Sequence, residues 1–454
     1  FNVVLHNLER HYQAVNETGD TTVVRENYDL ARISAAAQNR RPSVLMCGFS
    51  LQIGGGETYP IVLANEMKKQ GVTVTFLNFN LDTYSEQIRG MIDRTIPVIT
   101  LESTDYLGRI LRQTGADVVH SHHASIDAIL SLWLSSMDTK CKQVITLHGM
   151  YETMNMEDCL SSFDTLRNTC KKAIYIADKN LTRLNEVGYT RFFDLIKLGN
   201  GLPRMEVTPV GREELGIEED AFVFCIVSRA VPQKGWQEAA NAVIMANKTS
   251  KRRIHLILVG DGEMREKLSS LNNPYVHVVG QRSNVRDYFA ASDMGLLPST
   301  YKGESYPLVV IECMLTGKPV LASNLGEVKH QLTDAQGEIA GMLIDLKNWK
   351  LDVKELSGMM VQIANDEALY QKLRDRVPVP VKSLTLSKSL RSTWKYIPKY
   401  RTSRASVWPL FPAIPCVFRM KRLYVNGKRV TIYPNDRHYY VLNIMNPISI
   451  EFVL

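Results

Sequence analysis

Two glutamates stand eight residues apart in the segment Glu304-Ser-Tyr-Pro-Leu-Val-Val-Ile-Glu312. We predict that Glu304 lies in the loop before a helix and that Glu312 lies about two turns inside that helix. A carboxylate there can accept hydrogen bonds from paired sugar hydroxyls, and backbone amides at the helix N-terminus can bind phosphate. Two glutamates on a helix more often face solvent. The apolar neighbours of this pair indicate burial instead, and a buried carboxylate needs partners.

A second candidate set consists of two cations, one at the end of an apolar, strand-like run at residues 222–229 and one in the loop after it. Arg229 and Lys234 stand in the sequence Ser-Arg-Ala-Val-Pro-Gln-Lys-Gly. Two cations in the loop that follows a strand suit a diphosphate, because Arg presents a planar fork of donors and Lys a point charge. The alternative is a pair of solvated loop cations, which are common.

Three consecutive glycines, Gly54 to Gly56, precede Glu57 and follow the first strand-like run of the chain. Glycine lets the backbone approach a phosphate closely, especially at the start of a helix. We therefore interpret the triglycine as a second phosphate-binding element. A plain turn is the alternative.

Histidines gather in His120-Ser-His122-His123, and His148 closes the next strand-like run. Three clustered histidines could bind a metal, but we expect the first two to alternate across a strand, and no carboxylate accompanies them. We predict no metal site. A role in hydrogen bonding or catalysis and a purely structural role both stay open.

Strand-like runs alternate with helix-length segments along most of the chain. In the first half, such runs are found at residues 43–49, 72–80, 117–123, 143–149 and 172–177. After the turn-rich sequence Asn-Gly-Leu-Pro-Arg they restart at residues 222–229, 255–262, 276–281, 294–299 and 318–323. This alternation predicts βαβ units and parallel sheets. The fold class is therefore α/β, with two facing Rossmann-like domains that bind ligands in the cleft between them, at the carboxyl ends of the strands.

The pattern divides the chain into five predicted parts. They are a helical lead-in or linker (1–40), an N-terminal Rossmann-like acceptor domain (41–203), a C-terminal Rossmann-like donor domain (204–385), a crossover helix (386–400) and a small β-rich appendage (401–454). Asn426-Gly427, flanked by β-rich runs, predicts a hairpin in the appendage. The roles of the first and last parts are not specified by the sequence.

In their order along the chain, these motifs resemble glycosyltransferase family 4, the retaining enzymes of the GT-B fold, of the bacterial cell-surface polysaccharide type. The resemblance covers roughly residues 43–400. Its motifs are the glycine loop, Val-His-Ser-His, Thr-Leu-His-Gly, Asn-Gly at the hinge, Ser-Arg…Lys-Gly, Val-Gly-Asp-Gly, and Glu-x7-Glu followed by Gly-Lys-Pro-Val. Each is weak alone, but the ordered set is specific. Ile-Lys-Leu-Gly-Asn-Gly at the hinge departs from the more usual Val-Ile-Pro-Asn-Gly.

The resemblance implies a role for individual residues. The implied catalytic residues are His122, Arg229, Lys234 and Glu304. The implied donor-binding residues are Gly54, Gly55, Arg229, Lys234, Arg282, Glu304, Ser305, Tyr306, Leu308 and Glu312. In the family, the glycine loop and the two cations hold the diphosphate, the first glutamate and the backbone after it hold the donor sugar, and the second glutamate holds the ribose. Arg282 would lie where the backbone reads the base, and His122 near the reacting sugar.

We therefore expect a retaining glycosyltransferase that moves a sugar from a nucleoside-diphosphate-sugar to a glycan or lipid-linked acceptor, in the assembly of a surface polysaccharide such as a capsule or O-antigen. No cofactor or metal is expected, because two cations can neutralise the diphosphate and no Asp-x-Asp cluster is present. Two alternatives stay open: a non-catalytic nucleotide-sugar-binding module of a larger assembly, and a sugar-nucleotide epimerase. The donor sugar, the base and the acceptor are not specified by the sequence.

The composition, 45% apolar and 22% charged, is that of a soluble globular protein. No run approaches the roughly 20 apolar residues of a membrane-spanning helix, and the first residues do not resemble a secretory signal. The seven cysteines are scattered and form no C-x-x-C pair, which favours a reducing cytoplasm.

The net charge of +7 is unevenly distributed, since residues 372–437 hold sixteen Lys and Arg against two acids. Within this stretch, residues 382–404 hold seven basic residues and no acid. Such a segment suits an anionic membrane surface, and we hypothesise peripheral association with the inner face of the membrane rather than a nucleic-acid partner. Acidic glycans and a merely solvated basic face are the alternatives.

Overall fold

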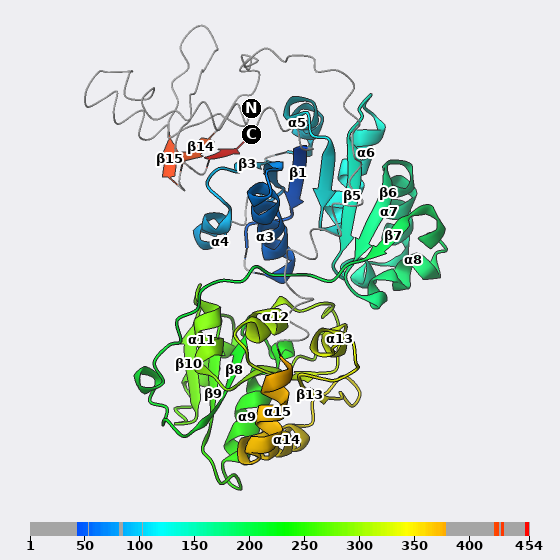
Figure 1. Ribbon diagram of the computed structural model, residues 1–454. Helices are drawn as coiled ribbons and strands as arrows, with labels where there is room; N and C mark the ends of the chain where they lie inside the picture. Colours follow the sequence, from blue (N-terminus) through cyan, green and yellow to red (C-terminus); the bar gives the residue numbers. More distant parts are fainter. Residues whose placement is uncertain are drawn as a thin grey trace, which may run out of the picture. The chain divides into compact units, whose positions relative to one another are not determined.

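The computed structural model describes residues 43–377 apart from 53, 81–84 and 102, together with the backbone of three short strands between residues 422 and 453 (Figure 1). These residues divide into two compact units. Unit 1 holds the described residues up to Tyr175, Arg183–Ile196 and the three C-terminal strands. Unit 2 holds Ile176–Thr182 and the described residues from Lys197 onward. The predicted lead-in (1–40), crossover helix (386–400) and basic segment (382–404) lie outside the described residues.

Unit 1 is built on one sheet, with the strand order β15-β14-β16-β3-β2-β1-β4-β5-β6-β7. The seven strands of its first part are β1 (Ser43–Gly48), β2 (Thr73–Asn78), β3 (Pro97–Thr100), β4 (Val118–Ser121), β5 (Lys142–Leu147), β6 (Cys170–Tyr175) and β7 (Asp194–Lys197). The helices between them are α3 (Gly55–Lys69), α4 (Glu86–Met91), α5 (Leu107–Thr114), α6 (Ala124–Ser135), α7 (Met156–Thr169) and α8 (Thr182–Glu186). All four residues of β4 are buried, as expected for a parallel strand covered by helices on both faces.

The C-terminal strands extend the sheet of unit 1 at its β3 edge. Strand β14 (Arg422–Val425) pairs antiparallel with β15 (Lys428–Val430), with Val425 opposite Lys428. The hairpin predicted from Asn426-Gly427 is thus confirmed. Strand β16 (Ile450–Val453) lies between β14 and β3 and runs parallel to β3. The β-rich appendage is therefore continuous with the first sheet.

Unit 2 is built on a six-stranded sheet with the order β10-β9-β8-β11-β12-β13. Its strands are β8 (Phe222–Val227), β9 (Ile254–Val259), β10 (Val276–Gly280), β11 (Met294–Leu297), β12 (Val320–Ser323) and β13 (Gly341–Ile344). Its helices are α9 (Trp236–Ala246), α10 (Met264–Ser269), α11 (Val285–Ala291), α12 (Leu308–Leu315), α13 (Val328–Leu332), α14 (Val353–Asn365) and α15 (Glu367–Arg376). All five pairs of neighbouring strands in this sheet are parallel. The predicted α/β class with two Rossmann-like sheets is confirmed.

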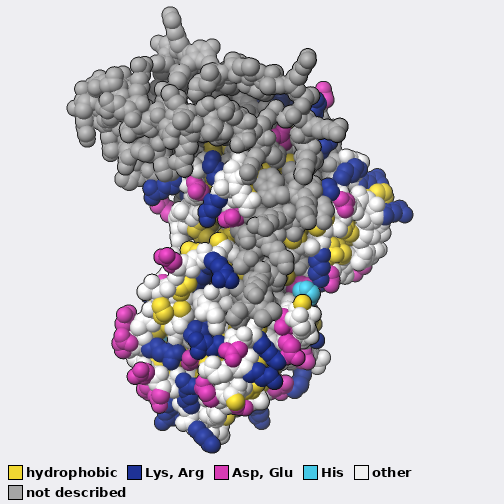
Figure 2. All heavy atoms as spheres, viewed as in Figure 1, with side chains coloured by type: hydrophobic (Ala, Val, Ile, Leu, Met, Phe, Trp, Pro, Cys, Tyr) yellow, Lys and Arg dark blue, Asp and Glu magenta, His cyan; other side chains and the backbone are white. Residues whose placement is uncertain are grey.

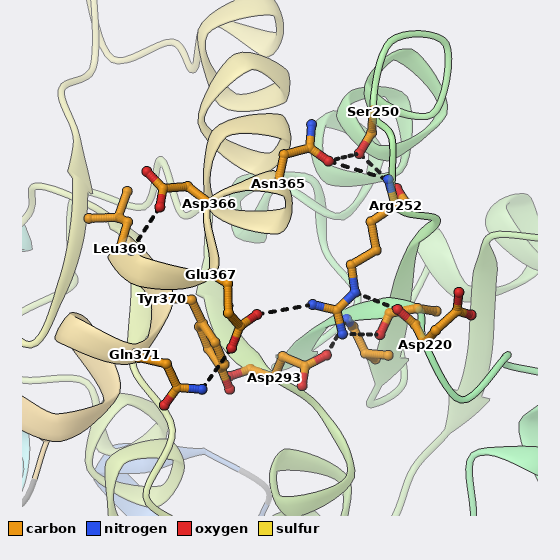
Figure 3. Close-up of polar contacts among 12 residues, drawn as sticks. Asp220, Ser250, Arg252, Asp293, Asn365, Asp366, Glu367, Leu369, Tyr370 and Gln371 are labelled. Atoms are coloured by element: carbon orange, nitrogen blue, oxygen red, sulfur yellow. Dashed lines mark hydrogen bonds and ion pairs between the residues drawn. The ribbon is translucent and has the colours of Figure 1, made fainter.

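Polar side chains tie the last two helices of unit 2 to the rest of the unit (Figure 3). At the end of α14, Asn365 Oδ1 accepts hydrogen bonds from Ser250 Oγ at 3.1 Å and from the Arg252 amide at 3.3 Å. In α15, Tyr370 donates to the Asp293 carbonyl at 3.2 Å. These contacts fix α14 and α15 against the amino ends of the strands, away from the loops that carry the predicted site.

Both sheets contain the strand order 3-2-1-4-5-6 of the doubly wound fold, in which ligands bind where the order reverses. In unit 1 the reversal falls between β1 and β4, and in unit 2 between β8 and β11. The loops that leave these four strands carry the glycine motif, His122, the two predicted cations and Glu304. No helix among the described residues is long and apolar enough to span a bilayer.

Candidate active site

Lys234 and Glu304 form an ion pair at the reversal point of unit 2. The pair joins the loop after β8 to the loop after β11, and its side chains are 14% and 10% exposed. The carboxylate oxygen bound to Lys234, Glu304 Oε1, also accepts from Ser299 Oγ at 3.0 Å. The Lys234 ammonium lies 5.0 Å from the centre of the Tyr301 ring. The prediction that Glu304 lies buried in the loop before a helix is confirmed.

A glycine allows these two loops to pack together. Gly235 has φ 72°, in the left-handed region, and a Cβ atom built on it would lie 2.1 Å from the Pro298 carbonyl oxygen. Only glycine fits both the conformation and the contact. The Lys234 side chain is thereby fixed beside residues 298–304.

The other predicted cations of unit 2 are exposed. Arg229 follows β8, and among the described residues no group forms a hydrogen bond or ion pair with its guanidinium. Arg282 follows β10 and donates to the Tyr288 hydroxyl at 3.1 Å and to the Gln281 carbonyl at 3.0 Å. Arg229 is thus an uncompensated positive charge at the reversal point.

Glu312 occupies the fifth position of α12, which begins at Leu308 after Pro307. It lies little more than one turn into the helix, so the predicted two turns are wrong, because the helix starts later than the motif suggested. Its side chain is half-buried, and desolvation raises its pKa to about 7 despite the attraction of Arg286. Within the described part of the chain, no hydrogen bond or ion pair reaches its carboxylate. When ionised, a carboxylate of this kind can accept hydrogen bonds from the hydroxyls of a ligand.

The residues between the two glutamates are held by segments distant in sequence. Ser305 is buried, and its hydroxyl accepts from Asn180 Nδ2 at 3.2 Å. The Tyr306 carbonyl accepts from Asn200 Nδ2 at 3.3 Å. Leu308 is half-buried at the first turn of α12.

A polar cluster next to Ser305 has no signal in the sequence. Its Glu327 is buried, whereas the side chains of Lys197 and Asp178 are 34% and 73% exposed. Lys197 Nζ lies 2.7 Å from Asp178 Oδ2 and 3.2 Å from Glu327 Oε1. The same Glu327 oxygen accepts from the Asp178 amide at 2.9 Å, while the Glu327 amide donates to the Ser305 carbonyl at 2.8 Å. The Glu304–Tyr306 backbone therefore depends on contacts that only the tertiary fold creates.

In unit 1, the glycine motif forms the N-terminus of α3. Gly54 precedes the helix in an extended conformation, and its carbonyl accepts from the Thr58 amide at 2.9 Å and the Thr58 hydroxyl at 2.8 Å. Gly55 is the first residue of the helix, and a Cβ atom on Gly56 would meet nothing within 4 Å. The triglycine is thus a helix start rather than a plain turn, and backbone amides at such a start can bind an anion.

The histidines of unit 1 lie side by side at the ends of β4 and β5. His120 and His122 have ring centroids 4.3 Å apart, so the expectation that they alternate across the strand is wrong. They are two residues apart and share one face. His122 Nδ1 lies 2.9 Å from His148 Nε2, whereas His122 Nε2 is buried and has no hydrogen-bond partner among the described residues. Burial lowers the pKa of His122 well below its usual value and that of His148 to about 4, so both rings are neutral at neutral pH.

A buried carboxylate, Asp127, connects the two segments that carry His122 and His148. Asp127 accepts hydrogen bonds from Ser121, next to His122, at 2.5 Å and from Tyr151, three residues after His148, at 2.8 Å. Desolvation raises its pKa to about 7 against the effect of these two bonds. No group of three or more His, Cys, Asp or Glu among the described residues has an arrangement that could hold a metal ion.

Two family profiles match the chain. Residues 208–376, in unit 2, match the glycosyl transferases group 1, and residues 53–186 match Glycosyltransferase Family 4. The chain is 24% identical over 298 residues to an Escherichia coli UDP-Gal:alpha-D-GlcNAc-diphosphoundecaprenol alpha-1,3-galactosyltransferase, covering 59% of this chain and 72% of the relative. It is 23% identical over 344 residues to a Campylobacter jejuni N,N'-diacetylbacillosaminyl-diphospho-undecaprenol alpha-1,3-N-acetylgalactosaminyltransferase, covering 69% of this chain and 87% of the relative.

Solved structures share the fold. Anabaena Alr3699/HepE in complex with UDP superposes with a TM-score of 0.63 at 17% identity, covering 78% of this chain and 98% of that one. Sucrose-phosphate synthase from Thermosynechococcus elongatus gives 0.62 at 16%, covering 78% and 98%. These structures show that the two sheets of the chain form the GT-B fold. The two profiles and the named relatives place the chain among the glycosyltransferases, in family 4.

Proposed function

We propose that this glycosyltransferase transfers a sugar from a nucleoside-diphosphate-sugar to a glycan or lipid-linked acceptor with retention of configuration and without a metal. The observation that carries the proposal is the buried Lys234–Glu304 pair at the reversal point of unit 2, with the half-buried carboxylate of Glu312 on the helix that follows. The cation would serve the diphosphate, Glu304 the donor sugar and Glu312 the ribose. Ser305, Tyr306 and Leu308 would complete the donor contacts.

The transfer breaks the bond between the anomeric carbon and the phosphate oxygen and forms a bond from that carbon to the acceptor oxygen. Negative charge develops on the leaving phosphate oxygen, and preorganised cations at that oxygen lower the barrier. Arg229 and Lys234 are the cations of unit 2 assigned to it. Retention would follow from attack on the same face as the leaving group, with the departing phosphate taking the proton of the acceptor hydroxyl.

The ion pair implies an exchange of partners when the donor binds. In the structure, the Lys234 ammonium is neutralised by Glu304. A bound diphosphate would take over the ammonium and leave the Glu304 carboxylate to accept hydrogen bonds from the sugar. Because Ser299 also donates to Glu304, the carboxylate would keep one hydrogen bond during this exchange.

The named relatives suggest which ligands to test first. The E. coli and C. jejuni relatives are named for acceptors linked to diphosphoundecaprenol, and the Anabaena structure contains UDP. We therefore propose a UDP-sugar donor, a lipid-linked or glycan acceptor, a role in surface polysaccharide assembly, and a cytoplasmic location at the membrane face.

The test begins with a thermal-shift titration of the full chain with UDP, because a ligand that binds only the folded state raises the melting temperature. UDP release from UDP-sugars is then measured with and without undecaprenyl-diphosphate-linked sugar. Acceptor-dependent release supports a transferase. UDP binding without turnover indicates a binding module, and conversion of the sugar without UDP release indicates an epimerase. Release that is lost in EDTA and restored by Mg²⁺ or Mn²⁺ would contradict the metal-free mechanism.

A further inference from the structure

A strained two-residue turn follows β13 in unit 2. The backbones of Lys347 and Lys350 exchange two hydrogen bonds of 3.0 Å, and the residues between them, Asn348 and Trp349, have φ of 53° and 61°. Such turns favour Asn-Gly, because glycine adopts the left-handed conformation without steric cost. A bulky residue there is a genuine outlier, and backbone strain of this kind is concentrated at functional sites.

The strained turn carries the exposed ring of Trp349 and is held to α14 by ion pairs of Lys347. The Trp349 residue is 48% exposed. In the same turn, Lys347 Nζ lies 3.3 Å from Asp352 Oδ2 and 3.1 Å from Glu355 Oε2, at the start of α14. The indole is therefore presented by an anchored turn.

A lysine from the loop after β11 (residues 298–304) lies against this ring. Lys302 Nζ lies 5.2 Å from the centre of the Trp349 ring. Its carbonyl accepts from Lys179 Nζ at 2.8 Å, which fixes the backbone of this loop two residues before Glu304. Among the described residues no carboxylate forms an ion pair with Lys302, so its charge is available to a ligand.

The residue before Lys302 connects this ring to the donor site. Tyr301 is 40% exposed, and its ring lies 5.0 Å from the Lys234 ammonium. A Cβ atom on Gly303 would lie 2.5 Å from this ring, so the glycine allows the ring to lie against the backbone. Two exposed aromatic rings thus lie near this loop. The Tyr301 ring lies beside Lys234, and the Trp349 ring lies beside Lys302, the residue that follows Tyr301.

We propose that Tyr301, Lys302 and Trp349 form a subsite of unit 2 for the acceptor saccharide, in addition to the acceptor contacts expected from the N-terminal domain, and that this saccharide is acidic. Aromatic faces carry partial negative charge and pack against the polarised C–H groups on the faces of sugar rings, while Lys302 pairs with the carboxylate of a uronic acid. The inference rests on the proposed function. If Lys234 and Glu304 hold the donor, a saccharide bound beyond Tyr301 belongs to the acceptor.

Calorimetric titration of the full chain with tetragalacturonate and with neutral maltotetraose tests the subsite without requiring turnover. The unmodified protein should bind the acidic tetrasaccharide roughly tenfold more tightly than the neutral one, a preference that salt weakens. Trp349→Gly should weaken binding of both by roughly tenfold. Because glycine suits the left-handed turn, this variant should keep its fold.

Lys302→Ser provides a second, independent variant, and it should weaken binding of tetragalacturonate but not of maltotetraose. Leu271→Ala, which removes another exposed apolar side chain of unit 2 (42% exposed), should change neither. The proposal is wrong if Trp349→Gly binds like the unmodified protein, or if the unmodified protein binds neither tetrasaccharide. Failure of the proposed function would instead appear as absence of UDP binding to the unmodified chain.

Discussion

At the residue scale, Lys234 is bound by Glu304, although the proposed transfer needs its charge on the leaving diphosphate. Arg229 has no such competitor, because its guanidinium has no partner among the described residues. The two cations therefore differ in whether their removal would leave a buried carboxylate without a partner. Loss of Arg229 leaves no buried charge behind, whereas loss of Lys234 leaves the carboxylate of Glu304, whose side chain is 10% exposed, without its cation.

Arg229→Ala should lower turnover by about 10²–10³, the usual effect of removing one stabiliser of transition-state charge, without lowering the melting temperature. Lys234→Ala should lower turnover similarly and also destabilise unit 2. Steady-state UDP release and thermal denaturation measure both effects. An Arg229→Ala variant with near-normal turnover would remove Arg229 from the mechanism.

Glu304→Gln and Glu312→Gln should separate sugar contact from ribose contact. Glu304→Gln should lower turnover most, because the proposed role of the lost carboxylate is to hold the reacting sugar. It should also bind free UDP as tightly as the unmodified protein or more tightly, because the diphosphate no longer competes with Glu304 for Lys234. Glu312→Gln should mainly raise the KM of the donor. Equal changes in kcat and KM for the two variants would indicate that the pair is structural.

The raised pKa of Glu312, about 7, predicts a pH dependence of donor binding. In the proposed complex, ribose hydroxyls donate to the ionised carboxylate, so binding should strengthen as the pH rises from 6 to 8 through that pKa. The folding stability of the free protein should change in the opposite direction. Ionisation of this desolvated group costs stability as the pH rises from the ordinary carboxyl pKa toward 7. UDP titrations by calorimetry at several pH values measure the binding effect.

The Glu312→Gln variant is the control, because the terminal phosphate of UDP titrates in the same range. The difference between the unmodified protein and the variant isolates the contribution of Glu312. A difference that does not vary between pH 6 and 8 would contradict the assignment of Glu312 to the ribose.

At the scale of elements, the loops after β8 and β11 form one site because Gly235 lets them touch. Gly235→Ala should destabilise unit 2 by more than the about 1–2 kcal/mol of a left-handed non-glycine residue, because the new methyl would meet the Pro298 carbonyl. Activity should fall as well, since the 298–304 loop must move. Urea denaturation and UDP release measure the two effects.

Gly317→Ala is the matched control for this prediction. Gly317 has a similar φ of 77°, but a Cβ atom there would meet nothing within 4 Å. It should show the conformational cost alone, with turnover unchanged. If both variants behave alike, the contact between Gly235 and Pro298 does not position the site.

At the scale of the whole molecule, the positive charge of the chain is concentrated outside the described residues. The visible described surface mixes Lys and Arg with Asp and Glu (Figure 2). The basic segment at 382–404 is therefore our candidate for contact with an anionic leaflet, where each cation close to the surface contributes about 1 kcal/mol.

Flotation with vesicles that contain anionic lipid tests this association. The protein should float at low salt, less so as salt screens the charges, and not at all when Lys395, Lys399, Arg401 and Arg404 are changed to Ser. Vesicles of neutral lipid are the control. A protein that stays in the soluble fraction at low salt has no such membrane contact, and an acidic glycan becomes the better partner for the segment.

The sequence by itself determined the two Rossmann-like sheets and the loops that carry the chemistry. Buried parallel strands are continuous apolar runs, and the motif residues follow them directly, as Arg229 follows β8 and His122 follows β4. The strands β3, β7 and β13 were not predicted, because they begin with Pro97, Asp194 and Gly341, residue types that are depleted in strands. The Asn426-Gly427 hairpin was predictable because its turn chemistry is local.

Only the tertiary structure decided which of these residues meet. Lys234 and Glu304 are 70 residues apart, and Asp178 and Glu327 are 149 apart, so no local pattern could pair them. The start of α12, and with it the depth of Glu312, was also misjudged from the motif. The pairing of β16 with β3 and the position of Trp349 beside Lys302 likewise depend on packing between distant segments. Local periodicity sets the elements, whereas burial and charge pairing between loops set the site.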